Sequence, residues 1–529
     1  GADDIASFST DQLRALTAAA VGSLSTAQVA ALTTAQVDKL TVAQVQAMTT
    51  AQVAALSGDQ VGKLTTTQVA ALSATQIVGM ETADLAVLTT AQVQALSASS
   101  LAAMTTTQVA SITTAQISKL TANQVKALTA TQVGALTTAQ VGEMTTEQIN
   151  ALSATQVKSM TTSDVAKLSA SQIKALTGAA VAALSTAQIK ALTTTQADQL
   201  TAAQVSALTA AQVSGLDTED LAKFTSEQVQ SLNATAVAAL STTQIQALTT
   251  AQVDKLTATQ IKALTTGQVA SLSATQVPKL TTTQLAALSA TQMAGLETTD
   301  LAALDSAQLQ SLTVSAVAAL STTQVASLTT AQVSKLTATQ VQSLTATQVG
   351  ALTTAQVKEL TTTQVAALSA AQVAAMVTAD LAQLSTAQVQ ALSVAAVAAM
   401  STGQVAALTT AQTEKLTNAQ VAAFTNSQVI ALTTAQVTAM TTSQVATLSA
   451  AQVKAMETAD LVQLTGAKLK TMSLAGLSAL SADQISALGT EQTSNLTTAQ
   501  VAALSITQAK ALGADDIASF STDQLRALT

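Results

Sequence analysis

The chain is 529 residues long, and its composition alone excludes most kinds of chemistry. It contains no His, Cys, Trp or Tyr, so the usual general base, thiol nucleophile, zinc ligands and stacking aromatic rings are missing. Its 29 acidic and 21 basic residues give a net charge of −8 and are scattered singly along the chain, which excludes binding to a phosphate backbone.

Hydrophobic residues make up 48% of the chain, but Thr, Ser and Gln interrupt them in nearly every eight residues. No apolar run approaches the roughly 20 residues that a membrane-spanning helix needs. We therefore expect a protein without catalytic activity, cofactor, nucleic-acid partner or membrane span.

The chain consists of consecutive blocks of eight residues, called octads here. It divides into 66 octads and one further residue, without insertion or deletion. The octads at 33–40, 49–56 and 137–144 are TTAQVDKL, TTAQVAAL and TTAQVGEM. Position 1 is usually Thr or Ser, position 5 Val, Ile or Leu, and position 8 Leu, Met or Phe, while position 4 is Gln in 50 of the 66 octads. This repetition predicts one repeated structural unit rather than several different domains.

Each octad carries the signal of a helix start. Thr or Ser followed three residues later by Gln is the capping box, in which the two residues satisfy each other's backbone N–H groups. One continuous helix is excluded, because eight residues turn by about 800° and the apolar positions would rotate by about 80° per octad. We predict one helix of about 10 Å per octad, with positions 5 and 8 on a single inward stripe. Helices this short are stable only when they stack on neighbours.

Two features oppose this interpretation. The chain is rich in Thr and Val, which favour strands, but positions 5 and 8 would then point to opposite faces of a sheet. The octad at 273–280, SATQVPKL, has Pro278 at position 6, where proline removes a helical amide donor. We expect the helix of that octad to end near position 6.

Eight octads have Asp instead of Gln at position 4. In chain order these residues are Asp4, Asp84, Asp164, Asp220, Asp300, Asp380, Asp460 and Asp516. Their spacings are 80, 80, 56, 80, 80, 80 and 56 residues, which correspond to ten or seven octads and sum to 512. Residues 513–529 repeat residues 1–17 letter for letter. We interpret residues 1–529 as a single continuous solenoid, with one long period over 1–512 and a restart of the period at 513–529.

Other substitutions keep step with these Asp octads. Two octads after the Asp, position 4 again lacks Gln, as at Ala20, Ser100, Ala180, Ala236, Ala316, Ala396 and Gly476. Four octads after it, position 7 is usually Lys, as at Lys39, Lys119, Lys255, Lys335 and Lys415. If equivalent octads face the same side of a superhelix, ten and seven octads hold three and two turns, or about 3.3 to 3.5 octads per turn. Gene duplication alone would leave the same spacing.

Acidic residues gather only in the Asp octads, and oxygen ligands are those that calcium prefers. The weak calcium candidates are Asp3, Asp4, Glu81, Asp84, Asp217, Glu219, Asp220, Glu297, Asp300, Glu457 and Asp460. Two or three carboxylates fall short of the roughly six to eight oxygen ligands of calcium, and an acid in the first turn of a helix is favourable without metal. We therefore predict structural contacts without metal at these octads, including Asp164, Asp380 and Asp516, with calcium as the alternative.

Two further columns have alternative interpretations. The Gln column at position 4 is either an amide network inside the coil or a ladder that binds sugars, and its recurrence in 50 octads favours structure. The Thr pairs at positions 1 and 2 are either caps or a hydroxyl array of the kind that binds ice, and the capping role already explains position 1.

The motif LTTAQVAAL, as at residues 496–504, resembles two known groups of repeats. Its start is similar to the first helix of the repeats of plant-pathogen TAL effectors, without their base-reading loop. The whole chain resembles the octad-repeat regions of very large bacterial secreted or surface proteins, which are described as adhesin-like or haem-utilisation proteins. This resemblance implies a bacterial, exported, extracellular protein, although no haem ligand is present.

Together these observations predict a structural protein that forms an extracellular filament, sheath or matrix by stacking of its repeats, with itself as partner. A rigid spacer stalk of a bacterial adhesin and a protein-binding scaffold are the alternatives. The chain starts at Gly1 within the pattern, so we expect a segment of something longer.

Overall fold

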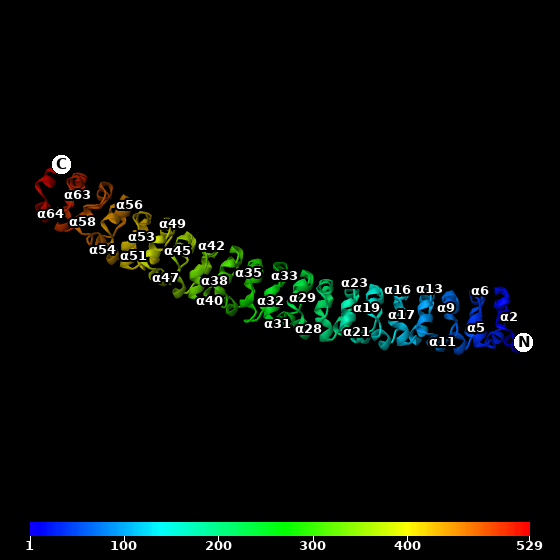
Figure 1. Ribbon diagram of the computed structural model, residues 1–529. Helices are drawn as coiled ribbons and strands as arrows, with labels where there is room; N and C mark the ends of the chain where they lie inside the picture. The colour runs from blue at the N-terminus through cyan, green and yellow to red at the C-terminus, as the bar shows by residue number, and fades with distance from the viewer. Residues whose placement is uncertain (529) are drawn as a thin grey trace. The chain divides into compact units, whose positions relative to one another are not determined.

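The computed structural model describes residues 1–528, and its helices follow the octads (Figure 1). Within these residues there are 65 α-helices of four to six residues, one short 3₁₀ helix and no strand. The predicted all-α solenoid of very short helices is confirmed, and the strand interpretation is wrong. Among the same residues, no helix has the length and apolar content that crossing a membrane requires.

The chain divides into two compact units. Unit 1 comprises residues 1–271, from α1 (Ala2–Ala6) to α34 (Thr266–Ala270). Unit 2 begins at Leu272 and runs from the 3₁₀ helix η1 (Val277–Lys279) and α35 (Thr282–Ala287) to α65 (Thr522–Ala527). The single continuous solenoid over 1–529, with its 512-residue period, remains a prediction.

The octad at 201–208 shows how eight residues make one helix, α26 (Ala202–Ser206). The Gln204 N–H donates to the Thr201 hydroxyl at 3.2 Å, and the Thr201 N–H donates to the Gln204 side-chain oxygen at 2.7 Å. This is the predicted capping box, and a cap of this kind stabilises a helix by about 1 kcal/mol. The helix ends where the Leu208 N–H donates to the Val205 carbonyl at 3.1 Å.

Positions 5 and 8 form the core, as predicted. Val205 and Leu208 are 0% and 1% exposed, and the corresponding residues of nearly all interior octads are buried as well. Position 8 has an extended backbone in octads such as that of α6 (Val42–Ala47), where Met48 leads directly to the next cap at Thr49. Each helix therefore stops after one to two turns, and the chain changes direction there.

One turn of the coil contains between three and four octads. Each helix packs on the helix three octads away, as in the series α17 (Ala130–Gly134), α20 (Ala154–Ser159) and α23 (Gly178–Ala183). The position-4 side chain of an octad contacts backbone 28 to 31 residues earlier, at the junction between the octads three and four before it. One turn is thus longer than three octads and shorter than four, a range that contains the predicted 3.3 to 3.5.

The proline octad lacks an α-helix. Residues 277–279 form the 3₁₀ helix η1, in which the Lys279 N–H donates to the Gln276 carbonyl at 2.9 Å. The capping box at its start is intact, since the Ser273 N–H donates to the Gln276 side-chain oxygen at 2.8 Å. Pro278 therefore narrows the helix rather than ending it early, because 3₁₀ bonding needs no N–H at that position.

Candidate functional site

The Gln column lies inside the coil and joins neighbouring turns. The side-chain N–H₂ of Gln204 donates to the carbonyls of Ile173 and Leu176, at 2.8 and 2.6 Å, while its oxygen accepts in the capping box. One amide thus satisfies its own helix start and the helix end of the preceding turn. Gln204 is only 2% exposed, so this amide is not accessible to a sugar.

One octad shows the same cross-turn bond with a different residue. Lys468 replaces Gln at position 4 of the octad at 465–472, and its Nζ donates to the Thr438 carbonyl, 30 residues earlier, at 2.5 Å. Burial lowers the pKa of Lys468. In both Gln204 and Lys468, the side chain at position 4 therefore donates a hydrogen bond to a backbone carbonyl of the preceding turn.

The Asp octads cannot supply such a donor, because an ionised carboxylate only accepts hydrogen bonds. Asp84, Asp164, Asp220, Asp300, Asp380, Asp460 and Asp516 are buried, whereas Asp4 is exposed. The companion acids Asp3, Glu81, Asp217, Glu219, Glu297 and Glu457 lie on the surface. Apart from Asp4, the position-4 carboxylates are thus buried, while their acidic companions are exposed.

Most of the buried carboxylates accept a hydrogen bond from a threonine of the preceding turn. The Thr138, Thr354 and Thr434 hydroxyls donate to Asp164, Asp380 and Asp460 at 2.8 to 2.9 Å. Each of these threonines stands 26 residues before its Asp, and Thr194 has the same relation to Asp220. Asp516 instead accepts from the Thr493 hydroxyl at 3.0 Å. These five octads therefore share an Asp–Thr hydrogen bond between turns.

Asp84 and Asp300 lack this threonine, since Gly58 and Ala274 stand 26 residues before them. Burial raises the pKa of both carboxyls. The negative charge of Glu81 raises the pKa of Asp84 further, and that of Glu297 does the same for Asp300. A hydrogen bond from the backbone of the same glutamate lowers each pKa in part. Burial also raises the pKa of Asp220, while the bond from Thr194 opposes this rise.

Asp380 has one buried carboxylate oxygen, Oδ2, without a hydrogen-bond partner. Its octad has Val377 at the cap position, so no cap hydroxyl is available. Asp164 shows the contrast, because both the N–H and the hydroxyl of Thr161 donate to its Oδ2, at 2.9 and 2.7 Å.

The structure does not gather the candidate acids into a ligand set. Among residues 1–528, no group of three or more acidic side chains is arranged as metal ligands are. The prediction that the Asp octads work without metal, and its calcium alternative, both stay predictions until binding is measured.

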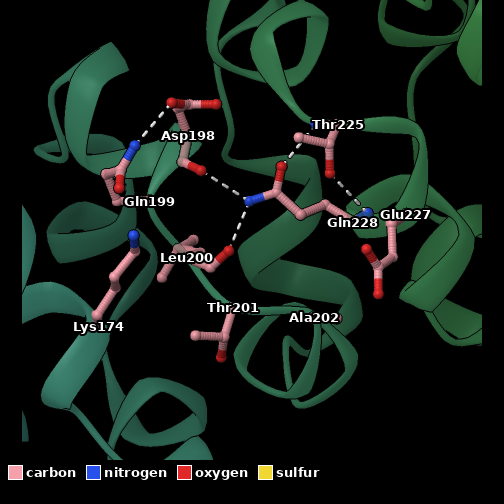
Figure 2. A pocket seen from close by; sticks show the side chains of 9 residues that line it. All are labelled: Lys174, Asp198, Gln199, Leu200, Thr201, Ala202, Thr225, Glu227 and Gln228. Atoms are coloured by element: carbon pink, nitrogen blue, oxygen red, sulfur yellow. Dashed lines mark hydrogen bonds between the residues drawn. The ribbon is translucent and has the colours of Figure 1, made fainter.

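Shallow polar hollows lie on the coil between successive turns, and Figure 2 shows one of about 310 Å³. It is lined by Lys174, Asp198, Gln199, Leu200, Thr201, Ala202, Thr225, Glu227 and Gln228. Its floor is a cross-turn bond, in which Gln228 donates to the carbonyls of Asp198 and Leu200 at 2.9 and 2.5 Å. Lys174 and Glu227 lie on opposite sides, so the hollow presents both charges and no aromatic ring (Figure 2).

The same hollow recurs at equivalent positions elsewhere in the coil. Equivalent hollows include Lys119, Glu359 and Asn495, each at position 7 of its octad, as Gln199 is. Sequence reasoning noted Lys119 but missed the hollows, the threonine partners and the cross-turn role of Gln. Threonine 26 residues before an Asp was the available signal for the threonine partners.

A family model described as "ALTTAQ repeat" matches the chain in twelve segments, several of which overlap. They are residues 5–42, 34–66, 77–114, 132–162, 141–178, 159–194, 213–250, 245–274, 293–330, 347–378, 373–410 and 453–490. Together these segments cover more than half of the chain. No curated protein matches it significantly.

Proposed function

The chain belongs to the ALTTAQ repeat family, and from this premise we propose that it is a secreted structural protein whose stacked turns build an extracellular filament, sheath or matrix. The family match and the helical fold make it a tandem repeat protein, consistent with a structural scaffold. The filament, its extracellular place and the absence of catalysis are our proposals.

The cross-turn amide bond is the observation that carries this proposal. An interior octad donates from its position-4 amide to the turn before it and accepts at its own helix end from the turn after it. Gln204, for example, donates to Leu176, whose octad includes Gln172, which donates to Met144. Each such bond stabilises by about 1 kcal/mol, so long stacks gain stability in proportion to their length.

Residues 1–16 and 513–528 have the same sequence, but different side chains of the two copies are exposed. Gln12 is exposed while Gln524 is buried, and Leu13 is 0% exposed while the equivalent Leu525 is 44% exposed. The first copy thus presents its position-4 side chains, and the second presents its core positions. In the interior of the coil, the turns before and after cover the corresponding faces.

Electron cryomicroscopy of the purified protein and of native material tests the proposal. We expect filaments with a layer spacing of roughly 9 Å, the distance between packed helices. At about 27 residues per turn, 512 residues make about 19 turns, or a repeat of about 170 Å. Discrete particles, or a repeat unrelated to the octads, would overturn the filament and leave a spacer stalk or a binding scaffold.

A pair of variants links the filament to the amide bond. Gln12→Ala with Gln28→Ala removes two position-4 amides, of which Gln12 is exposed and Gln28 half-buried, and we expect shorter or fewer filaments. Gln46→Ala is the matched control, because Gln46 is an exposed glutamine at position 6. Equal filament lengths in all three proteins would show that assembly uses another contact.

A further inference from the structure

The backbone carbonyl at position 8 of an octad is a hydrogen-bond acceptor at the end of a helix. The last carbonyls of a helix have no partner within that helix, so they need a donor from elsewhere. Leu176 receives one from Gln204, whose side-chain N–H₂ donates to the Leu176 carbonyl at 2.6 Å across 28 residues. The residue at position 4 of the following turn therefore decides whether this carbonyl is satisfied.

Two octads that lack Gln at position 4 keep this hydrogen bond by other means. Ser100 stands at position 4 of its octad, and its hydroxyl donates to the Leu72 carbonyl, 28 residues earlier, at 3.0 Å. The octad with Ala236 at position 4 begins with Asn233, whose side-chain amide donates to the Leu208 carbonyl at 3.1 Å. Leu208 stands 28 residues before Ala236. Three different side chains thus donate to a position-8 carbonyl of the preceding turn.

The Asp octad at 81–88 has no such donor when its carboxyl is ionised. The carbonyl 28 residues before Asp84 belongs to Leu56, and within residues 1–528 no donor bonds to it. Asp84 and Leu56 are both buried, at 5% and 4% exposed. An ionised carboxylate only accepts hydrogen bonds, whereas a protonated carboxyl group has one O–H donor. A proton on Asp84 therefore converts the side chain into the kind of donor that position 4 supplies elsewhere.

The Asp84 carboxyl faces the preceding turn and is long enough to reach it. A Cβ added at Gly58 would lie 3.5 Å from Oδ1 of Asp84. In the octad of Asp164, the same oxygen accepts from Thr138, which stands where Gly58 stands. The Ser100 hydroxyl, on a shorter side chain, already spans the separation of 28 residues at 3.0 Å.

Few charges surround this carboxyl. Its helix α11 (Thr82–Val87) packs on α8 (Gly58–Gly62) and α14 (Thr106–Ser111), and the octad of α14 has no charged residue. Burial raises the pKa of the carboxyl and the charge of Glu81 raises it further, while a bond from the Glu81 backbone lowers it in part. The charged residues of its own octad, of the α8 octad and of the octad four places later are all exposed, and they are Glu81, Asp59, Lys63 and Lys119.

We propose that Asp84 is a pH-sensitive joint between two turns of unit 1. When its carboxyl takes up a proton, the O–H donates to the Leu56 carbonyl and takes the place of the bond that Gln makes in other octads. When the carboxyl loses the proton, this donor is lost, and two oxygens face each other without a hydrogen between them. The joint is therefore closed in acid and open at higher pH.

The pH range follows from the pKa of Asp84, which burial raises above the ordinary 3.8. The closed joint contributes to the free energy of unfolding fully below about pH 3.8, and this contribution is lost as the pH rises through the folded-state pKa. A threonine 26 residues before the Asp has the opposite effect, because its hydroxyl donates to the carboxylate and favours the ionised form, as Thr194 does at Asp220. Gly58 stands in that place before Asp84, so this hydroxyl is missing there.

The joint lies within one chain, so it goes beyond the proposed function and acts whether or not filaments form. Its test is a ¹³C magnetic-resonance titration of the full chain from about pH 3 to about pH 8 in EDTA, with label in the aspartate carboxyls and leucine backbone carbonyls. The Asp84 and Leu56 signals are those that disappear in Asp84→Gln and Leu56→Met. Methionine occupies position 8 elsewhere, as at Met48. We expect both signals to titrate with one midpoint above the ordinary 3.8.

Two substitutions of Gly58 separate a hydroxyl from side-chain size. An added Cβ at this position makes only ordinary contacts, the closest at 3.5 Å, and valine occurs at position 2 of another octad, as at Val42. Gly58→Thr should lower the midpoint by about one pH unit, because its hydroxyl donates to the carboxylate. The matched control Gly58→Val should raise the midpoint or leave it unchanged, because valine adds burial without a donor. Circular dichroism checks that all variants fold.

A Leu56 signal that does not follow Asp84, a midpoint at or below the ordinary 3.8, or equal shifts in Gly58→Thr and Gly58→Val would overturn the proposal. In Asp84→Gln the Leu56 signal should no longer depend on pH, because the amide donates at every pH. Calcium in place of EDTA should leave the midpoint unchanged, and a midpoint that falls with calcium would assign the carboxyl to a metal instead. None of these measurements depends on filaments, so the proposed function stands or falls separately.

Discussion

At the scale of single residues, position 4 decides how one turn binds the next. Gln acts as acceptor for its own cap and as donor to the preceding turn, as Gln204 shows. Asp keeps the acceptor role but loses the donor, so the carbonyls 28 and 31 residues earlier receive no bond from it. At Asp164 the contact runs in the opposite direction, because the hydroxyl of Thr138, 26 residues earlier, donates to the carboxylate.

The raised pKa values of Asp84, Asp220 and Asp300 predict a pH dependence of stability. Burial raises each folded-state pKa above the ordinary 3.8, so the folded chain binds more protons than the unfolded chain between these values. This contribution to the free energy of unfolding is therefore fully present below about pH 3.8 and is lost as the pH rises through the folded-state pKa.

Variants with Asp84→Asn and Asp220→Asn should lose this part of the pH dependence, as measured by urea denaturation between about pH 4 and pH 7. Asp59→Asn is the matched control, because Asp59 is an exposed first-turn acid. A slope that is unchanged in the double variant would contradict the assignment of the effect to these carboxyls.

At the scale of the element, each helix is defined by its cap and limited by its neighbours. The capping box starts the helix at position 2, and the inward side chains of positions 5 and 8 anchor it. The distance to the next turn then determines how large a side chain fits at an outer position such as position 6. Gly134, at position 6 of its octad, shows this limit, because an added Cβ would lie 2.7 Å from the Ser159 carbonyl oxygen.

Two glycine substitutions separate helix propensity from packing between turns. Gly267→Ala meets no atom within 4 Å and should stabilise the chain by about 0.5 to 1 kcal/mol, because alanine favours the helix. Gly134→Ala should destabilise it by about 1 to 3 kcal/mol, because the methyl group forces the two turns apart. Thermal and urea denaturation measure both, and a stabilising Gly134→Ala would show that the turns separate at little cost.

At the scale of the whole molecule, stability is a sum over neighbouring turns rather than the property of one central core. In each unit, helices pack on those three octads away, and position-4 amides bond to the octad four places earlier. A single substitution should therefore affect only the turns next to it. A deletion that shifts the octads relative to the turns should affect every later turn.

Deletions of whole octads test the phase. Removal of residues 84–163 takes out ten octads, or three turns, and leaves Asp164 in the place of Asp84. We expect the melting temperature to shift by less than about 3 °C, because all turn contacts are restored. Removal of residues 92–163 takes out nine octads and moves Lys167 out of line with Lys63 and Val87, to a place now occupied by Ala95. This variant should melt lower, and equal melting temperatures would show that the turn period does not constrain position 7.

The sequence alone determined the features that depend on contacts within an octad. The repeat, the capping box, the short helices and the inward positions 5 and 8 all follow from hydrogen bonds and side-chain spacing over at most eight residues. The period of the Asp octads also indicated 3.3 to 3.5 octads per turn, because equivalent positions must recur after whole turns.

Only the tertiary structure showed which residues contact one another between neighbouring turns. The second role of Gln204, the threonine partner of Asp164 and the alignment of Lys39 with Lys63 join residues 24 to 31 positions apart. Their geometry depends on how far each short helix rotates the chain, and no local rule gives that rotation. The proline octad was predicted to shorten its helix, whereas residues 277–279 form a narrower 3₁₀ helix.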